Sequence, residues 1–282
     1  MAMGIKRIRP VIAAVAFLIM ARGTGLAADR PIEVDLELVL AVDVSLSMDE
    51  EEQRLQRLGY IDAIRSPEVL SAIQNGLTGR IAVTYVEWAG HLHQEVIVDW
   101  MVIDSEDKAH QFANRLARAP FKRVFRTAIG SIIHYAIEMI EDNAFTGLRR
   151  TIDISGDGPS NEGPKVVDAR NAAVARGIVI NGLPIDIDDF RRPWPKFFDP
   201  AEIADYYEHC VIGGPGAFLI SVRKRENIGV AVKRKLVTEI AANTHRLNFP
   251  PVIKVTNHTL CTIGEFMWRK TEPLPTVIKP RP

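Results

Sequence analysis

The chain has 282 residues, of which 47% are hydrophobic and 25% are charged, and its formal net charge is zero. This length suits one large domain or two small ones, and the ordinary composition excludes a mostly disordered, collagen-like or polytopic membrane protein. Two cysteines are too few for a disulfide scaffold or a Cys-rich zinc domain, and a neutral chain lacks the basic excess of a nucleic-acid-binding protein.

The first 22 residues contain four basic side chains and no acidic one. An unbroken apolar run extends from Val11 to Ala21, and small residues follow in Gly25-Leu-Ala-Ala28. This pattern predicts a secretory signal peptide over residues 1–27, and hence a periplasmic or secreted protein. A transmembrane helix needs about 20 apolar residues, so the run favours a signal peptide over a membrane span.

The rest of the chain alternates between two hydrophobic patterns. Short apolar runs predict strands over 36–42, 80–88, 95–102, 150–154, 178–183 and 217–222. Helical spacing predicts helices over 49–64, 105–118, 127–142, 164–176, 200–209 and 227–242. A short link containing Gly90 joins the second and third strands as a hairpin. We therefore predict an α/β fold with a doubly wound, mostly parallel sheet, one antiparallel strand and helices on both faces.

The last part of the chain differs in composition from the predicted domain. Residues 243–282 are rich in proline and predict an extension with little structure of its own. Residues 28–222 have a charge balance of −12, whereas residues 223–282 have a balance of +8. The acidic domain favours cation binding over nucleic acid. The basic end predicts a solvated surface, with weak contact to an anionic membrane surface or an acidic partner as the alternative.

Oxygen-bearing side chains follow the predicted strands at one edge of the sheet. Asp43, Ser45 and Ser47 end the first strand, Thr127 opens a helix, and Asp157 comes just after strand 150–154. Ligands of such sheets bind beyond the carboxyl ends of the strands, where these residues would meet. Carboxylate and hydroxyl oxygens suit Mg²⁺, with Mn²⁺ or Ca²⁺ as alternatives. A cation bound mainly by hydroxyls keeps charge with which to attract an acidic group.

Two of these residues also have a simpler structural interpretation, and other candidate ligands are weaker. Ser47-Met-Asp-Glu50 matches a capping box, and Thr127 could cap the helix that it opens. Asp153 is a rival carboxylate, but its position inside a strand favours a role within the sheet. The pair His91 and His93 has no third ligand at zinc-like spacing, which favours a polar hairpin.

The five residues in this chain order resemble the metal-ion-dependent adhesion site of von Willebrand factor type A (vWA) domains. The resemblance extends over about residues 34–242, and the segments 177–184 and 206–217 are similar to a bacterial family of exported vWA-like proteins of unknown function. It implies a metal site formed by Asp43, Ser45, Ser47, Thr127 and Asp157. Two departures are Phe125-Arg126 before the threonine, where glycine is common, and Gly156 before the aspartate.

These observations predict an exported, cation-dependent binding module rather than an enzyme. Its partner would be a protein or a small molecule that presents a carboxylate. One alternative is a metal-dependent hydrolase, for which Glu162 and the loop Asp186–Asp189 are the nearby candidates for a general base. Another is a structural module with a vestigial site. P-loop, dinucleotide-binding and α/β-hydrolase motifs do not match.

The two cysteines, Cys210 and Cys261, are 51 residues apart. In an oxidising compartment they could pair and tie the C-terminal extension to the last predicted strand. Two buried free thiols are the alternative, because the sequence does not give their separation.

Overall fold

The computed structural model describes residues 30–187, 200–241 and 261–266. The chain divides into two compact units, residues 1–30 and 31–282, and the fold below belongs to the second. The predicted signal peptide lies outside the described residues, and so does the C-terminal extension apart from 261–266. Within the described residues, none of the helices has both the length and the apolar character that crossing a membrane requires.

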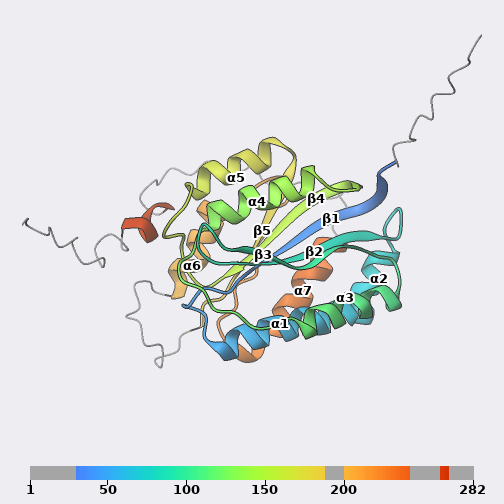
Figure 1. The fold of residues 1–282 in the computed structure, drawn as a ribbon, viewed down its shortest axis with the longest axis horizontal. Coiled ribbons are helices and arrows are strands. Elements are labelled where there is room, and N and C mark those ends of the chain that lie inside the picture. The colour runs from blue at the N-terminus through green and yellow to red at the C-terminus, as the bar shows by residue number, and fades with distance from the viewer. Residues whose placement is uncertain (1–29, 188–199, 242–260, 267–282) are drawn as a thin grey trace, which may run out of the picture. The chain divides into compact units, whose positions relative to one another are not determined.

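The core of the second unit is a five-stranded sheet with the strand order β3-β2-β1-β4-β5. All neighbouring strands are parallel except β2 and β3, which are antiparallel, so the predicted mostly parallel sheet with one antiparallel strand is confirmed. The strands are β1 (Ile32–Asp43), β2 (Ile81–Trp88), β3 (Gln94–Ile103), β4 (Phe145–Gly156) and β5 (Ile178–Pro184). Strand β1 lies at the centre, and its carboxyl end therefore meets loops from both sides of the sheet (Figure 1).

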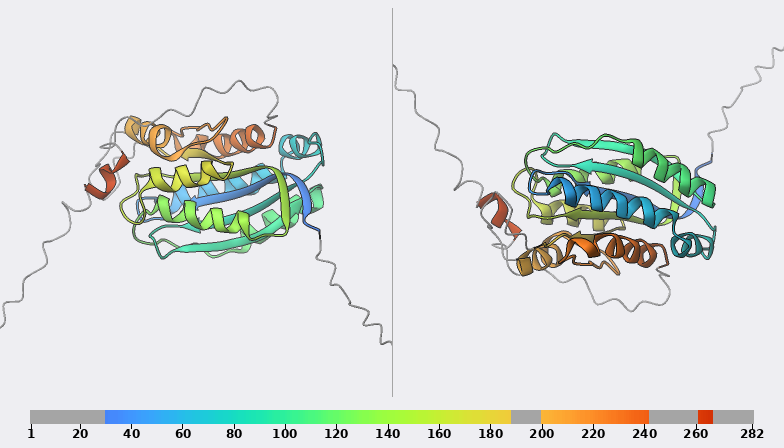
Figure 2. Two further views of the ribbon diagram at one scale, coloured as in Figure 1. Left: turned by 90° about the horizontal axis from the view of Figure 1, so that it is seen from above. Right: turned by 90° about the horizontal axis from the view of Figure 1, so that it is seen from below.

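Helices cover both faces of this sheet. The helices are α1 (Glu50–Arg65), α2 (Pro67–Gln74), α3 (Glu106–Arg118), α4 (Ile129–Glu141), α5 (Val166–Ala175), α6 (Pro200–Tyr206) and α7 (Ile228–Ala241). A π-helical turn, Tyr207–Val211, continues α6, and a 3₁₀ turn, Arg225–Asn227, precedes α7. Helices α4 and α5 lie on one face, and α1, α3 and α7 lie on the other (Figure 2).

Burial of both faces explains the continuous apolar runs of the sequence. Alternate residues of β1 point to opposite faces: Leu38 and Leu40 enter the core under α1 and α7, whereas Val39 and Ala41 enter the core under α4. All four side chains are at most 1% exposed. A strand covered by helices on both faces has no solvent-facing side, so its sequence shows no polar alternation.

The predicted final strand, 217–222, is not a regular strand. It lies parallel to β5 but forms only isolated bridges, Gly182 with Leu219 and Ile185 with Val222. The oxygen of Pro184 accepts a hydrogen bond from the Val222 N–H at 2.9 Å. A proline has no N–H to donate back, so the ladder is interrupted at Pro184. The expectation of a regular sixth strand was wrong for this reason.

Other elements also differ from the sequence predictions. Helix α2 was not predicted; it begins at Pro67, and the side chain of Ser66 caps it. Strand β4 begins five residues before the predicted start, at Phe145. Helix α5 begins at Val166 with Lys165 as its N-cap, so Pro164 precedes the helix that it was expected to open.

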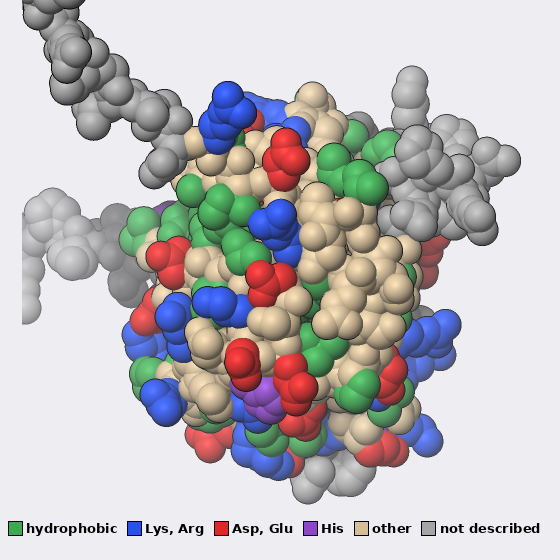
Figure 3. Space-filling view, turned by 90° about the vertical axis from the view of Figure 1, so that its right-hand side faces the viewer, with side chains coloured by type: hydrophobic (Ala, Val, Ile, Leu, Met, Phe, Trp, Pro, Cys, Tyr) green, Lys and Arg blue, Asp and Glu red, His purple; other side chains and the backbone are tan. Residues whose placement is uncertain are grey.

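The edge of the sheet where β1 begins shows basic and acidic side chains interspersed, with apolar side chains between them (Figure 3). Leu77 and Leu148 are exposed hydrophobic residues, at 86% and 64%. The predicted site lies at the opposite edge, where β1 ends.

Candidate functional site

Asp43 is the last residue of β1, and its side chain is fully buried. The Ser45 N–H donates a hydrogen bond of 2.7 Å to one carboxylate oxygen, Oδ1. The other, Oδ2, has no hydrogen-bond partner among the described residues. Burial raises the pKa of Asp43 well above its ordinary value, and the charge of Asp157 raises it further. A buried carboxylate oxygen with no partner is costly, and a bound cation would offset that cost.

Two serines connect the end of β1 to the end of β4. The hydroxyl oxygens of Ser45 and Ser47 are 2.8 Å apart, and Ser47 donates a hydrogen bond of 2.5 Å to Oδ1 of Asp157. Asp157 directly follows β4 and is only 7% exposed. The structure therefore brings four of the five predicted residues into one connected group, because the Ser45 backbone also binds Asp43.

The capping interpretation of Ser47 was wrong. The N-cap of α1 is Asp49, which accepts a hydrogen bond from the Glu52 N–H, while the Glu52 side chain accepts one from the Asp49 N–H. This reciprocal pair is a complete capping box two residues after the predicted one. Since Asp49 caps the helix, the hydroxyl of Ser47 is available to the site.

The loop that carries the two serines is held by the segment before Thr127. The Leu46 N–H donates to Val124 O, and the Val124 N–H donates to Val44 O, each at 3.0 Å. The guanidinium of Arg123 donates to the carbonyl oxygens of Leu46 and Met48 at 2.9 and 2.8 Å. These bonds fix the loop in one conformation and place the Thr127 loop beside the end of β1.

Thr127 is 4% exposed and lies at the same edge. Its N–H donates to Asn161 Oδ1 at 3.0 Å, and its carbonyl oxygen accepts from the Asn161 N–H at 2.8 Å. The N-cap of α4 is Ala128, which makes no side-chain cap bond, so the helix-cap interpretation of Thr127 was wrong. Reciprocal bonding to Asn161 links the Thr127 loop to the loop that begins with Asp157.

The residue before Thr127 has an unusual backbone. Arg126 has a φ of +79°, the left-handed conformation that non-glycine residues rarely adopt. Its Nε lies 3.8 Å from Glu162 Oε2, so the Arg126 charge is compensated in part by an ion pair. The other Glu162 oxygen accepts a bond from the His91 N–H at 2.7 Å and lies 3.0 Å from His91 Nδ1. Glu162, one candidate for a general base, thus interacts with both Arg126 and His91. The other candidate was the acidic loop 186–189, of which residues 188 and 189 lie outside the described residues.

Tyr207 and the close packing at Gly156 were not predicted from the sequence. A Cβ atom on Gly156 would lie 2.8 Å from Asp43 Oδ2 and 2.8 Å from the Tyr207 hydroxyl. Glycine is required here because both polar atoms approach the backbone closely. Tyr207 is fully buried, and burial, together with the charges of Asp43 and Asp157, raises its pKa well above the ordinary value. The phenol therefore stays neutral beside the carboxylates.

This donor set fits a hard divalent cation. It offers two carboxylates and three hydroxyl-bearing side chains at one edge of the sheet, together with the unsatisfied Oδ2 of Asp43. Oxygen ligands of this kind suit Mg²⁺, which usually keeps some of its waters. No group of three or more His, Cys, Asp or Glu side chains that could hold a metal occurs among the described residues, which is consistent with a set that contains only two carboxylates.

The comparisons with known proteins agree with this fold. The family model described as "Protein of unknown function (DUF1194)" matches residues 33–244. No curated protein matches the chain by sequence.

Solved vWA structures and pilus proteins are similar in fold. The pilus adhesin SpaC of Lactobacillus rhamnosus GG, in an open conformation, aligns with a TM-score of 0.54 and 11% identity over 74% of this chain and 30% of its own. A von Willebrand factor type A protein of Catenulispora acidiphila has a TM-score of 0.51 and 13% identity over 73% of this chain and 43% of its own. The vWF domain of the type V pili tip protein Mfa5 of Porphyromonas gingivalis has a TM-score of 0.51 and 9% identity over 74% and 96%. At these identities the likeness establishes the fold, and the chain spans less than half of the first two proteins.

Proposed function

The chain belongs to the family described as "Protein of unknown function (DUF1194)", it has a vWA-type fold, and we propose that it is an exported binding module that holds a divalent cation and recognises an acidic group on a partner protein. The observation that carries this proposal is the group formed by Asp43, Ser45, Ser47 and Asp157, in which the buried Asp43 Oδ2 has no partner among the described residues.

The residues that would hold the cation are Asp43, Ser45, Ser47, Thr127 and Asp157. Mg²⁺ is the proposed ion, with Mn²⁺ or Ca²⁺ as alternatives. When bound, the ion would supply positive charge to a partner's carboxylate. The two carboxylates formally balance a divalent charge, and the other three side chains are neutral hydroxyls, so a carboxylate of the partner would take the place of one of the waters that Mg²⁺ usually keeps. The Arg123 bonds to the loop carbonyls keep these oxygens in place before the partner arrives.

Exposed aromatic side chains beside the site favour a protein partner over a small molecule. Phe121 and Phe125 are 55% and 69% exposed, and both lie within six residues of Thr127. The Arg57 guanidinium lies 3.8 Å from the centre of the Phe121 ring and donates to Ala119 O at 2.7 Å, which holds this aromatic ring at the surface. Aromatic residues are enriched in protein interfaces. Two proteins of similar fold are pilus proteins, which adds support for protein binding.

Export is supported by the chemistry of the cysteines. Cys210 and Cys261 form a disulfide bond in the structure. Disulfides persist in oxidising compartments such as the periplasm or the exterior and are rare in the cytosol. This bond agrees with the signal-peptide pattern of the sequence, so we propose a periplasmic or secreted location.

A Mn²⁺ titration tests the metal site directly. Isothermal calorimetry on the purified protein is expected to show one binding event per chain, which Asp43→Asn and Asp157→Asn each abolish. Asp62→Asn, on the exposed side of α1, is the matched control and is expected to bind as the native protein does. Mn²⁺ should also raise the unfolding temperature of the native protein and of Asp62→Asn, but not that of the two site variants. Equal binding by all four proteins would contradict the assignment.

A further inference from the structure

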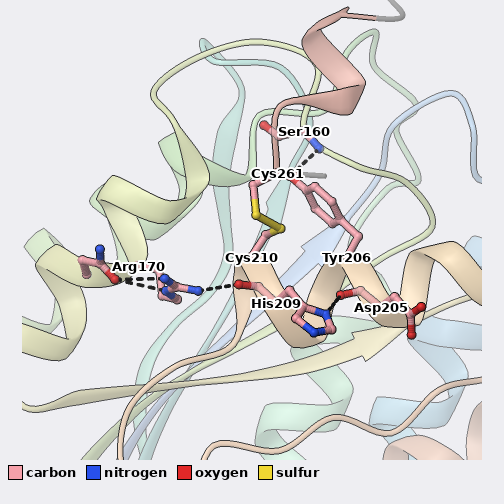
Figure 4. The surroundings of a disulfide bond; sticks show 8 residues. Ser160, Arg170, Asp205, Tyr206, His209, Cys210 and Cys261 are labelled. Carbon is pink, nitrogen blue, oxygen red and sulfur yellow. Dashed lines mark hydrogen bonds between the residues drawn. A yellow bond between two sulfur atoms is a disulfide. The ribbon is translucent and has the colours of Figure 1, made fainter. Parts of the chain in front are cut away.

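A disulfide fixes a remote C-terminal turn to the helical segment beside the site. Cys210 lies in the π-helical turn after α6, and its partner Cys261 begins the helical turn 261–266, which we call the tethered turn (Figure 4). Both cysteines are buried, at 0% and 4% exposure. The bond joins residues 51 positions apart, so it holds the tethered turn against a helix that is distant in the sequence.

The tethered turn packs on the loop that follows Asp157. A Cβ atom on Gly264 would lie 2.1 Å from the carbonyl oxygen of Ser160 and 3.2 Å from Cβ of Pro159. The first distance is far inside van der Waals contact with a backbone atom, so any side chain at residue 264 would push the turn and the loop apart. Glycine at this position lets the two backbones touch.

The same loop is held from the helix side. The buried Tyr206 hydroxyl accepts a hydrogen bond of 3.2 Å from the Ser160 N–H, and Tyr206 lies one helical turn before Cys210 (Figure 4). The helix itself is anchored to α5, because Arg170 donates a bond of 2.8 Å to the carbonyl oxygen of His209. Ser160 is therefore held between the anchored helix and the tethered turn, which the disulfide attaches to that helix.

Ser160 transmits this restraint to the predicted metal ligands. Its hydroxyl lies 3.3 Å from Thr127 O and accepts a bond of 3.2 Å from the Ile129 N–H at the start of α4. The next residue, Asn161, makes the two bonds with the Thr127 backbone described above. The loop from Asp157 to Asn161 thus carries one ligand directly and fixes the backbone of another.

We infer that the tethered turn is a clamp that positions Asp157 and Thr127 for the cation, with Gly264 and the Cys210–Cys261 disulfide as its positioning residues. The inference rests on the proposed function, because it assigns a role to residues around that same site. In this arrangement, the tethered turn sets the metal affinity through Ser160. Its described contacts include none with the five ligand side chains.

Two variants loosen the clamp in different ways. Gly264→Ala keeps the disulfide but places a methyl group against Ser160 O, whereas Cys210→Ser with Cys261→Ser removes the tether. Both are expected to bind Mn²⁺ about 10- to 100-fold more weakly than the native protein, as is typical when residues that support metal ligands are changed. Gly229→Ala is the matched control, because a Cβ there would meet only ordinary contact, 3.9 Å from Gly59 Cα.

Calorimetry at a temperature well below the unfolding transition gives the Mn²⁺ affinities, and circular dichroism checks that each variant is folded. The Mn²⁺ electron paramagnetic resonance spectrum should also change in Gly264→Ala, since it reports on the oxygens around the ion. A clamp with a purely structural role would lower the unfolding temperature and leave affinity and spectrum unchanged, which would overturn the inference. Failure of the native protein to bind Mn²⁺ would instead overturn the proposed function, and the clamp with it.

Discussion

Ser47 and Asp157 are 110 residues apart in the sequence, and the hydroxyl of one donates a hydrogen bond of 2.5 Å to the carboxylate of the other. Strands β1 and β4 are parallel neighbours in the sheet, and this bond joins the loops that follow them. The bond therefore holds the two side chains close together, at the place where the proposed cation would bind. A preorganised ligand pair loses less conformational entropy when it binds.

Replacing Ser47 with alanine tests this contact. Ser47→Ala removes one predicted ligand and the hydrogen bond to Asp157, so we expect Mn²⁺ binding to weaken at least about tenfold. The metal-free protein should lose about 1.5–3 kcal/mol of its free energy of unfolding, the range for a hydrogen bond to a charged group. Urea unfolding and calorimetry measure the two effects. Ser71→Ala, which removes an exposed hydroxyl on α2, is the control. If both variants bind Mn²⁺ with the same affinity, Ser47 is not a ligand.

Gly156→Ala tests the close packing around Asp43. The new methyl carbon would lie 2.8 Å from both Asp43 Oδ2 and the Tyr207 hydroxyl, so one of them must move. We expect a destabilisation of about 1–3 kcal/mol, as for overpacking in a core, together with loss of Mn²⁺ binding. Gly158→Ala provides a control in the same loop, since a Cβ there would meet nothing within 4 Å. A variant at Gly156 that binds Mn²⁺ normally would show that Asp43 Oδ2 is not a ligand.

The sheet could be predicted because its strands are buried on both faces and leave continuous apolar runs. The placement of Asp43 and Asp157 in the candidate site could be predicted because parallel strands end at one edge of the sheet, so both residues had to lie there. The sequence could not show which of two adjacent patterns caps α1, because Ser47 and Asp49 both fit a capping box. Only the fold decides, by bringing Asp157 within reach of Ser47.

Contacts between distant segments explain the remaining errors. Pro184 interrupts a strand pairing with residues 217–222 that the apolar pattern alone suggested. Ser160 and Gly264 have no sequence signal, because their importance comes from a backbone contact across more than 100 residues. Lys235 lies in a helix whose charged residues suggest a solvated face, yet its side chain is fully buried.

Phe125→Ala separates partner binding from metal binding. The Phe125 ring is 69% exposed beside Thr127, so its loss should leave Mn²⁺ affinity unchanged. The binding assay uses an array of peptides, each with one Asp or Glu. In one set the acidic residue is flanked by Leu and Phe, and in the other it is flanked by Ser. In the presence of Mn²⁺, the native protein should prefer the set with apolar flanks. The variant should bind those peptides about tenfold more weakly, as expected for an aromatic anchor. Leu148→Ala, at the opposite edge, is the matched control; equal preference for both kinds of flank would argue against an aromatic contact.

A buried charged cluster lies between β4 and α7. The Lys235 Nζ lies 2.5 Å from an oxygen of Asp153 and 2.5 Å from one of Glu239, and all three side chains are at most 2% exposed. Asn181 donates a further bond of 2.9 Å to Glu239. Burial raises the pKa of Tyr60, which lies in α1, well above its ordinary value, and the charge of Asp153 raises it further. The cluster contains two carboxylates and one ammonium group, so a proton on one carboxylate balances its charge.

This cluster makes stability depend on pH. Burial and the charge of Glu239 raise the pKa of Asp153 to about 7 from an ordinary value of 3.8, although Lys235 opposes them. The folded protein therefore keeps a proton that the unfolded chain releases, and the free energy of unfolding falls as pH rises from about 4 to 7. Asp153→Asn keeps the shape and cannot ionise, so this fall should be smaller in the variant than in the native protein. Urea unfolding at intervals between pH 4 and 8 measures both slopes, with Asp62→Asn as the exposed control. Parallel curves for the native protein and Asp153→Asn would show that Asp153 is ionised throughout this range and that Lys235 compensates both carboxylates.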